Sequence, residues 1–76
     1  MKEMLEYIAK NLVDDPGAVS VAETENGDTV HLELRVGQSD MGKVIGRQGR
    51  IAKEIRTLMR AVAAKRGKRV VVDIVD

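Results

Sequence analysis

The sequence predicts an α+β domain in which three helices cover one face of a three-stranded mixed sheet. Its 76 residues are the length of one small domain, and 43% of them are hydrophobic, which is enough for a core. The hydrophobic spacing alternates between the period of a helix and that of a strand, in the order α-β-β-α-α-β. The last strand follows a helical crossover, so we expect it to pair parallel with the strand before that crossover. We therefore expect residues 1–76 to form a single domain.

The first half of the chain is predicted to form a helix and a hairpin. Residues 2–13 have the spacing of an amphipathic helix, and the segment 14–17 (Asp-Asp-Pro-Gly) ends it because proline disfavours helix in the residue before it. A first strand is expected over 18–25. The Asn-Gly pair at 26–27 is a hairpin signal, with positive φ expected at both residues. Residues 29–36 have apolar side chains at every second position, which predicts a half-buried strand antiparallel to the first.

The second half is predicted to contain two helices and a last strand. Ser39 or Asp40 is a candidate helix cap, and a short helix is expected to end near Ile45. Residues 50–66 are predicted to form the longest helix, with its core side chains and its basic side chains on separate faces. The apolar face holds Ile51, Ala52, Ile55, Leu58, Met59, Val62 and Ala63, and the basic face holds Arg50, Lys53, Arg56 and Arg60. Residues 70–75 are predicted to form a strand with β-branched side chains on both faces.

Positive charge is concentrated in the second half, although the formal net charge is only +1. Residues 1–42 carry three Lys or Arg and nine Asp or Glu, whereas residues 43–69 carry ten Lys or Arg and a single acid, Glu54. A basic segment of this kind indicates a polyanionic partner. The alternative is an ordinary solvated helix face, which charge alone does not exclude.

Within the basic segment, residues 44–51 (Val-Ile-Gly-Arg-Gln-Gly-Arg-Ile) join the two predicted helices. Glycine has no Cβ, so the backbone at Gly46 and Gly49 can turn tightly and a ligand can approach it closely. Arg47 and Gln48, between the glycines, can donate hydrogen bonds to phosphate oxygens. The start of the helix that follows presents free amides and a partial positive charge, which suit an anion.

This motif at a helix–helix junction, together with the element order, resembles a type II KH domain. The resemblance covers the whole chain, and it is strongest to the small stand-alone bacterial KH proteins of the KhpA group. It implies a cytoplasmic protein that binds single-stranded RNA, with strand 69–76 as the other wall of the groove. It also implies a homodimer, or a heterodimer with a second, larger KH-containing protein. The residues predicted to contact RNA are Lys43, Val44, Ile45, Gly46, Arg47, Gln48, Gly49, Arg50, Ile51 and Lys53.

Binding through this site is expected to be weak and to show little sequence preference. Tyr7 is the only aromatic residue, so bases cannot stack on Phe or Trp platforms and would rest on aliphatic side chains. Contacts to three or four phosphates would give a log–log salt slope of roughly −2 to −3. These properties suit an RNA chaperone or a post-transcriptional regulator.

Several residues keep a second interpretation. The two glycines could form an ordinary turn between helices, and Val44, Ile45 and Ile51 could belong to the core and not to the groove. Arg56 and Arg60 are expected to face solvent. The rival function is a protein-interaction module of the same fold, which would bind a second copy or a partner through its groove or through helix 50–66.

Other kinds of site are not supported by the sequence. The chain has no cysteine and one histidine, His31, so neither a metal site nor a cofactor is predicted, and no enzyme is expected. Residues 37–43 match the first seven positions of a nucleotide-binding P-loop, but Val44 lacks the hydroxyl that would hold Mg²⁺. No apolar run approaches a membrane span, and Glu3 and Glu6 interrupt any signal peptide, so a cytoplasmic protein without a small-molecule substrate is expected.

Overall fold

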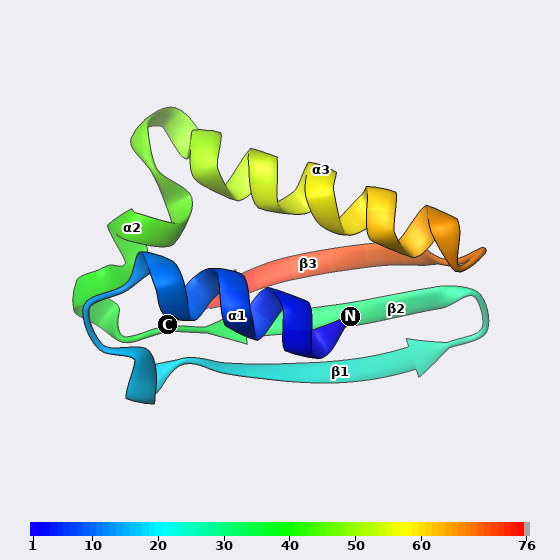
Figure 1. The fold of residues 1–76 in the computed structure, drawn as a ribbon, viewed down its shortest axis with the longest axis horizontal. Helices are drawn as coiled ribbons and strands as arrows, with labels where there is room; N and C mark the ends of the chain where they lie inside the picture. Colours follow the sequence, from blue (N-terminus) through cyan, green and yellow to red (C-terminus); the bar gives the residue numbers. More distant parts are fainter. Residues whose placement is uncertain (76) are drawn as a thin grey trace.

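The elements of the computed structural model, which describes residues 1–75, follow the predicted order (Figure 1). The helices are α1 (Lys2–Leu12), α2 (Met41–Ile45) and α3 (Arg50–Lys65), and the strands are β1 (Ser20–Asn26), β2 (Thr29–Arg35) and β3 (Arg69–Val75). Three single turns of 3₁₀ helix lie between them: η1 (Pro16–Ala18), η2 (Gln38–Asp40) and η3 (Arg47–Gly49). The predicted α+β class and element order are confirmed.

The sheet is mixed, as predicted, with β2 in its centre. β1 pairs antiparallel with β2, and β3 pairs parallel with it, so that Leu32 lies between Glu23 and Val72. A parallel pair needs a crossover, and α2 and α3 supply it. As a result β3 is an edge strand, and α3 runs back along the sheet above it (Figure 1).

The core lies between the helices and one face of the sheet. Along β2 the side chains of Val30, Leu32 and Leu34 are fully buried, whereas His31 between the first two is exposed and Glu33 between the last two is half-buried. This alternation is the period of a strand that is covered on one face only. The buried helix residues are Leu5 and Ala9 from α1, Val44 from α2, and Ala52, Ile55, Met59 and Ala63 from α3. The long third helix therefore contributes the largest share of the helical side of the core.

One local prediction, the position of the hairpin loop, is corrected by the structure. The hairpin loop consists of Gly27 and Asp28, because Asn26 still pairs with Thr29, and only Gly27 has positive φ, at 65°. A tight turn with glycine at its first central position needs no second residue of positive φ. On β3 the outward face is apolar at Val71, as expected, but this side chain stays exposed because no helix covers that face.

Candidate nucleic-acid interface

The Gly46–Gly49 loop is a sharp bend between α2 and α3 that depends on three residues with positive φ. Gly46 has φ 76° and ψ 174°, Gln48 has φ 58° and ψ 26°, and Gly49 has φ 75° and ψ 14°. Three backbone hydrogen bonds close the bend: from Gly46 N to Gly42 O at 2.9 Å, from Gly49 N to Gly46 O at 3.2 Å, and from Arg50 N to Arg47 O. The left-handed conformation costs a non-glycine residue about 1 kcal/mol, and Gln48 is the one such residue in the described chain.

The two glycines of the loop serve different needs. A Cβ on Gly46 would lie 2.6 Å from Cγ1 of Ile51, so the first turn of α3 packs directly on this backbone. A Cβ on Gly49 would meet no atom within 4 Å. Gly46 is therefore required for packing within the protein, whereas the space beside Gly49 is open to a ligand.

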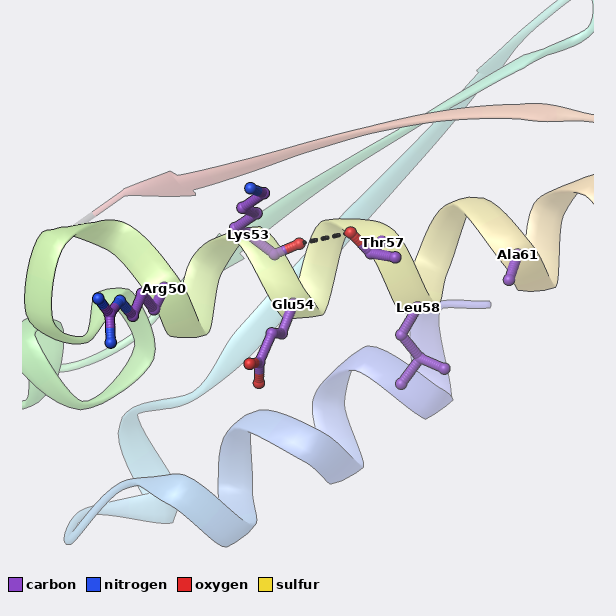
Figure 2. A pocket seen from close by; sticks show the side chains of 6 residues that line it. All are labelled: Arg50, Lys53, Glu54, Thr57, Leu58 and Ala61. Carbon is purple, nitrogen blue, oxygen red and sulfur yellow. Dashed lines mark hydrogen bonds between the residues drawn. The ribbon is translucent and has the colours of Figure 1, made fainter.

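The polar members of the predicted site lie on the surface. Arg47 and Gln48 are exposed at the bend, and Arg50 and Lys53 are exposed on the first turns of α3. Figure 2 shows Glu54 pointing toward α1 and Lys53 pointing away from it. These four side chains surround the N-terminal end of α3, which is the arrangement that an anion site requires.

The apolar members of the predicted site support the loop from below. Val44 is fully buried in the core, and Ile45 and Ile51 are half-buried and pack against the core. The sequence left open whether these side chains belong to the core or to the groove. The side chain of Val44 belongs to the core, because it has no free surface. For Ile45 and Ile51, contact with a ligand stays a prediction.

Lys43, another predicted contact, is engaged within the protein. Its ammonium forms ion pairs with Asp14 and, at 3.3 Å, with Asp40. The hydrogen bond to Asp14 raises the pKa of Lys43, burial opposes this, and Asp40 raises it further. A phosphate would have to compete with two carboxylates for this cation, so a contact between Lys43 and a ligand stays a prediction.

Asp40 does not act as the helix cap that the sequence predicts. It precedes α2, but its carboxylate makes no capping hydrogen bond to that helix. It accepts hydrogen bonds instead from the backbone N–H groups of Asp14 (3.3 Å) and Asp15 (3.1 Å), on the segment that follows α1. Burial disfavours its charge, but these two donors and Lys43 outweigh burial and lower the pKa of Asp40. The sequence could not show this role because the donors are 25 and 26 residues away.

Arg56, expected to face solvent, is half-buried between α3 and β3. Its Nε donates a hydrogen bond of 3.1 Å to the carbonyl oxygen of Val72, on the edge strand. A hollow of about 210 Å³ lies beside it. The hollow is lined by Arg56, Arg60, Val70, Val71, Val72 and Asp73. The contact between Arg56 and β3 could have been inferred from the predicted crossover, because the crossover places β3 next to the basic face of α3.

A second surface depression lies on the other side of α3, where Leu58 is 43% exposed (Figure 2). Its volume is about 570 Å³, and it is lined by Arg50, Lys53, Glu54, Thr57, Leu58 and Ala61. An adjoining hollow of about 260 Å³ extends it to Ile8 and Leu12 of α1. The apolar surface is therefore shared by α1 and α3.

The segment that resembles a P-loop in sequence is helical in the structure. Residues 37–43, which resemble a P-loop in sequence, form η2 and the start of α2, and their lysine is paired with acids. Within residues 1–75, no three His, Cys, Asp or Glu side chains are grouped so that they could hold a metal ion. None of the helices in this part of the chain has the length and apolar character needed to cross a membrane.

Comparison with known proteins gives one family. The family model described as "KhpA/KhpB, KH domain" matches residues 2–74. The "RNA-binding protein KhpA" of Clostridium acetobutylicum is 57% identical over 75 residues, covering 99% of this chain and 100% of its own. The proteins of the same name from Halalkalibacterium halodurans and Aquifex aeolicus are 50% and 49% identical, covering all of this chain and 100% and 96% of their own.

Two solved structures share the fold. One is Era from Aquifex aeolicus bound to GDP.AlF4−, with a TM-score of 0.65 and 21% identity. The other is Era in complex with MgGDPNP and nucleotides 1506–1542 of 16S ribosomal RNA, with a TM-score of 0.58 and 20% identity. Each match covers 96% of this chain but only 28% of the Era chain, so this chain corresponds to about a quarter of Era. At these identities the likeness concerns the fold alone.

Proposed function

The chain belongs to the KhpA/KhpB KH-domain family of non-catalytic RNA-binding proteins, and from that premise we propose that it clamps single-stranded RNA through the Gly46–Gly49 loop. The observation that carries the proposal is an exposed, glycine-based bend at the start of a 16-residue basic helix. We propose further that binding has low sequence preference and takes place in the cytoplasm. Such a protein would act as an RNA chaperone or a post-transcriptional regulator.

The phosphate contacts in this proposal come from the bend and from α3. No side chain of the described residues caps the start of α3. The Arg50 N–H donates to the carbonyl oxygen of Arg47, so in this proposal the anion binds to the first-turn amides that follow Arg50. Arg47 and Gln48 donate to phosphate oxygens from the exposed tip, and the open side of Gly49 lets the sugar–phosphate chain approach the backbone. Arg50 and Lys53 add screened attraction that does not depend on base identity.

The bases in this proposal lie toward β3. The wall there is built from valine side chains and from the edge of the strand, and Arg56 spans it by its bond to Val72. A base resting on aliphatic groups gains less than one that stacks on an aromatic ring. This composition is the reason to expect weak binding from a single copy.

The salt dependence of binding tests this proposal. Titration of the protein with a short single-stranded RNA at several salt concentrations is expected to give a log–log slope of roughly −2 to −3, because three or four phosphates are neutralised. Duplex RNA of the same sequence is expected to bind more weakly, because the bend contacts one strand and cannot read a closed helix. Fluorescence anisotropy measures both.

Crosslinking locates the same complex on the protein. Ultraviolet crosslinks from the single-stranded RNA are expected within residues 43–53. Crosslinks confined to other parts of the chain, or equal affinity for single strands and duplex, would contradict the loop as the binding site. Equal affinity for single-stranded and duplex RNA would mean that binding depends on charge attraction alone.

A second candidate function, self-association, is favoured by one observation. Leu58 is exposed beside two apolar side chains of α1, the half-buried Ile8 and the exposed Leu12. One apolar surface therefore extends over both helices. Glu54 and two basic residues, Arg50 and Lys53, surround it. A two-fold interface brings the same surface together from both copies, so a surface that carries both signs of charge around an apolar centre can pair acid with base across the axis. We propose that a second copy binds here, which would place two weak RNA clamps in one particle and raise their joint affinity.

Substitution of Leu58 by lysine is expected to convert the dimer to a monomer, because an ammonium at the centre of an apolar interface loses its hydration, a cost that pairing with Glu54 on the same helix does not offset. The measurement is molar mass by light scattering over a range of protein concentrations. Val71→Lys is the matched control, because Val71 is an exposed valine on the far face of the sheet. A wild-type protein with the mass of one chain at every concentration, or a Leu58→Lys variant that stays dimeric, would contradict this interface.

A further inference from the structure

We propose that Asp40 is a positioning residue for the RNA-binding loop: its buried carboxylate joins the start of α2 to the segment after α1 and so fixes the direction of the Gly46–Gly49 bend. The part of this inference that concerns RNA rests on the proposed function. The part that concerns the order of the loop does not, and the experiment below separates them.

The burial of Asp40 is the first observation that carries the inference. Its side chain is 2% exposed, and among residues 1–75 it is the one charged residue that is buried. A buried carboxylate is tolerated only where its oxygens are hydrogen-bonded and its charge is paired. Here Oδ1 accepts from Asp14 N and from Lys43 Nζ, both at 3.3 Å, and Oδ2 accepts from Asp15 N at 3.1 Å. The position is therefore held by three donors from two separate segments.

The weakness of α2 is the second observation. This helix has only five residues, and an isolated helix of that length is not stable in water. Within α2, Val44 is the one residue that is fully buried. Asp40 fixes the beginning of the helix to a neighbouring segment, Val44 fixes its middle to the core, and the bend begins at its end. Without the first of these attachments the helix keeps the apolar contacts of Met41, Val44 and Ile45 with the core, but its beginning is less restrained, and so is the direction of the bend.

The ion pair with Lys43 completes this arrangement. It joins residues i and i+3 across the first turn of α2, and the same ammonium also reaches Asp14 on the segment after α1. Lys43 of α2 and Asp40, which directly precedes α2, thus both contact the short segment after α1. The inference gives a structural role to residues 37–43, whose sequence resembles a P-loop but which bind no nucleotide in our proposal.

The test compares amide hydrogen exchange at the bend and in the sheet, for the wild type and for Asp40→Asn. Asparagine keeps the shape of the side chain but loses the ion pair and turns an N–H₂ group toward a backbone N–H. The Gly46 and Gly49 amides, both hydrogen-bonded within the bend, are expected to exchange about tenfold faster, whereas the Leu32 amide in the central strand changes much less. The affinity for single-stranded RNA is expected to fall about fivefold, since part of the binding energy is then spent on ordering the bend.

Val30→Ala is the control for a general loss of stability. Val30 is fully buried on β2, and its truncation is expected to accelerate exchange of the Leu32 amide as the whole domain opens more often. RNA affinity of the folded Val30→Ala protein is expected to match the wild type. A positioning residue and a purely stabilising one therefore give opposite patterns of exchange.

Each other outcome is decisive. Equal acceleration at Gly46 and Leu32 in Asp40→Asn, or none at either, overturns the inference. Selective acceleration with unchanged RNA affinity overturns the link to RNA binding. Selective acceleration in a protein whose wild type binds no RNA supports the positioning role and overturns the proposed function. If Asp40→Asn does not fold, Lys43→Gln removes the paired cation but keeps both backbone hydrogen bonds, and the absence of selective acceleration there overturns the inference.

Discussion

Replacement of Arg47 and Gln48 by aspartate is expected to lower the affinity for single-stranded RNA by about a hundredfold at low salt. The double variant removes two donors to phosphate, each worth about 1.5 kcal/mol, and a loss of about 3 kcal/mol corresponds to a hundredfold change. It also places two carboxylates where the phosphate chain approaches, so repulsion adds to the loss. The effect is measured by anisotropy titration with the same RNA at the same salt concentration.

The double variant is expected to fold, because both side chains are exposed and neither contributes to the core. At position 48, with φ 58°, aspartate accepts the left-handed conformation more readily than glutamine does. The matched control is Lys10→Asp with Asn11→Asp, an exposed cation and amide on α1 that undergo the same change of charge. An equal loss of affinity in the control would attribute binding to net charge alone. Full affinity in a folded loop variant would exclude this loop as the site.

The fold could be predicted because the spacing of apolar residues along each helix and strand shows which of its faces is buried. The alternation of Val30, Leu32 and Leu34 reports a strand with one covered face, and the separate apolar and basic arcs of α3 report a helix lying on a core. These are local patterns, and a sheet of three strands leaves few ways to connect them. The loop was found for the same reason, since a G-x-x-G bend between helices is a feature of consecutive residues.

What could not be predicted depends on contacts between distant segments. Val44 and Ile45 are adjacent and equally apolar, and only the packed structure shows that the first lies in the core and the second at its margin. The sequence gives Asp40 the appearance of an ordinary helix cap, because its donors come from the far side of β1 and β2 in the chain. The helical spacing likewise places Arg56 on the solvent-facing side of α3, and only the packed structure shows that β3 lies beside it and accepts its hydrogen bond.

The hairpin shows how a correct prediction can rest on an incorrect detail. The Asn-Gly signal located the turn, but the loop begins one residue later, at Gly27. One glycine at the first central position is enough for this turn, so the pairing between β1 and β2 extends to Asn26 and Thr29. The added pair lengthens the antiparallel ladder, which is the physical reason for the shift.

Substitution of Gly46 by alanine is expected to destabilise the domain by about 3 kcal/mol or more. The conformation at φ 76° and ψ 174° is essentially restricted to glycine and costs other residues about 1–3 kcal/mol. The new Cβ would also lie 2.6 Å from Cγ1 and 2.9 Å from Cβ of Ile51, and overpacking of this kind adds about 1–3 kcal/mol. Since the total stability of a small domain is about 5 kcal/mol, a loss of about 3 kcal/mol removes more than half of it. Urea denaturation followed by circular dichroism measures the loss.

Gly49→Ala provides the contrast, because it changes only one of these terms. Its Cβ meets nothing within 4 Å, so the cost is the left-handed backbone alone, about 1 kcal/mol, less the gain from a more restricted unfolded chain. The same methyl group enters the open space beside the bend, so RNA affinity is expected to fall in a protein that remains folded. Equal stability losses at the two positions would mean that Ile51 moves aside without cost. Unchanged RNA affinity in Gly49→Ala would mean that the phosphate chain does not approach the loop from this side.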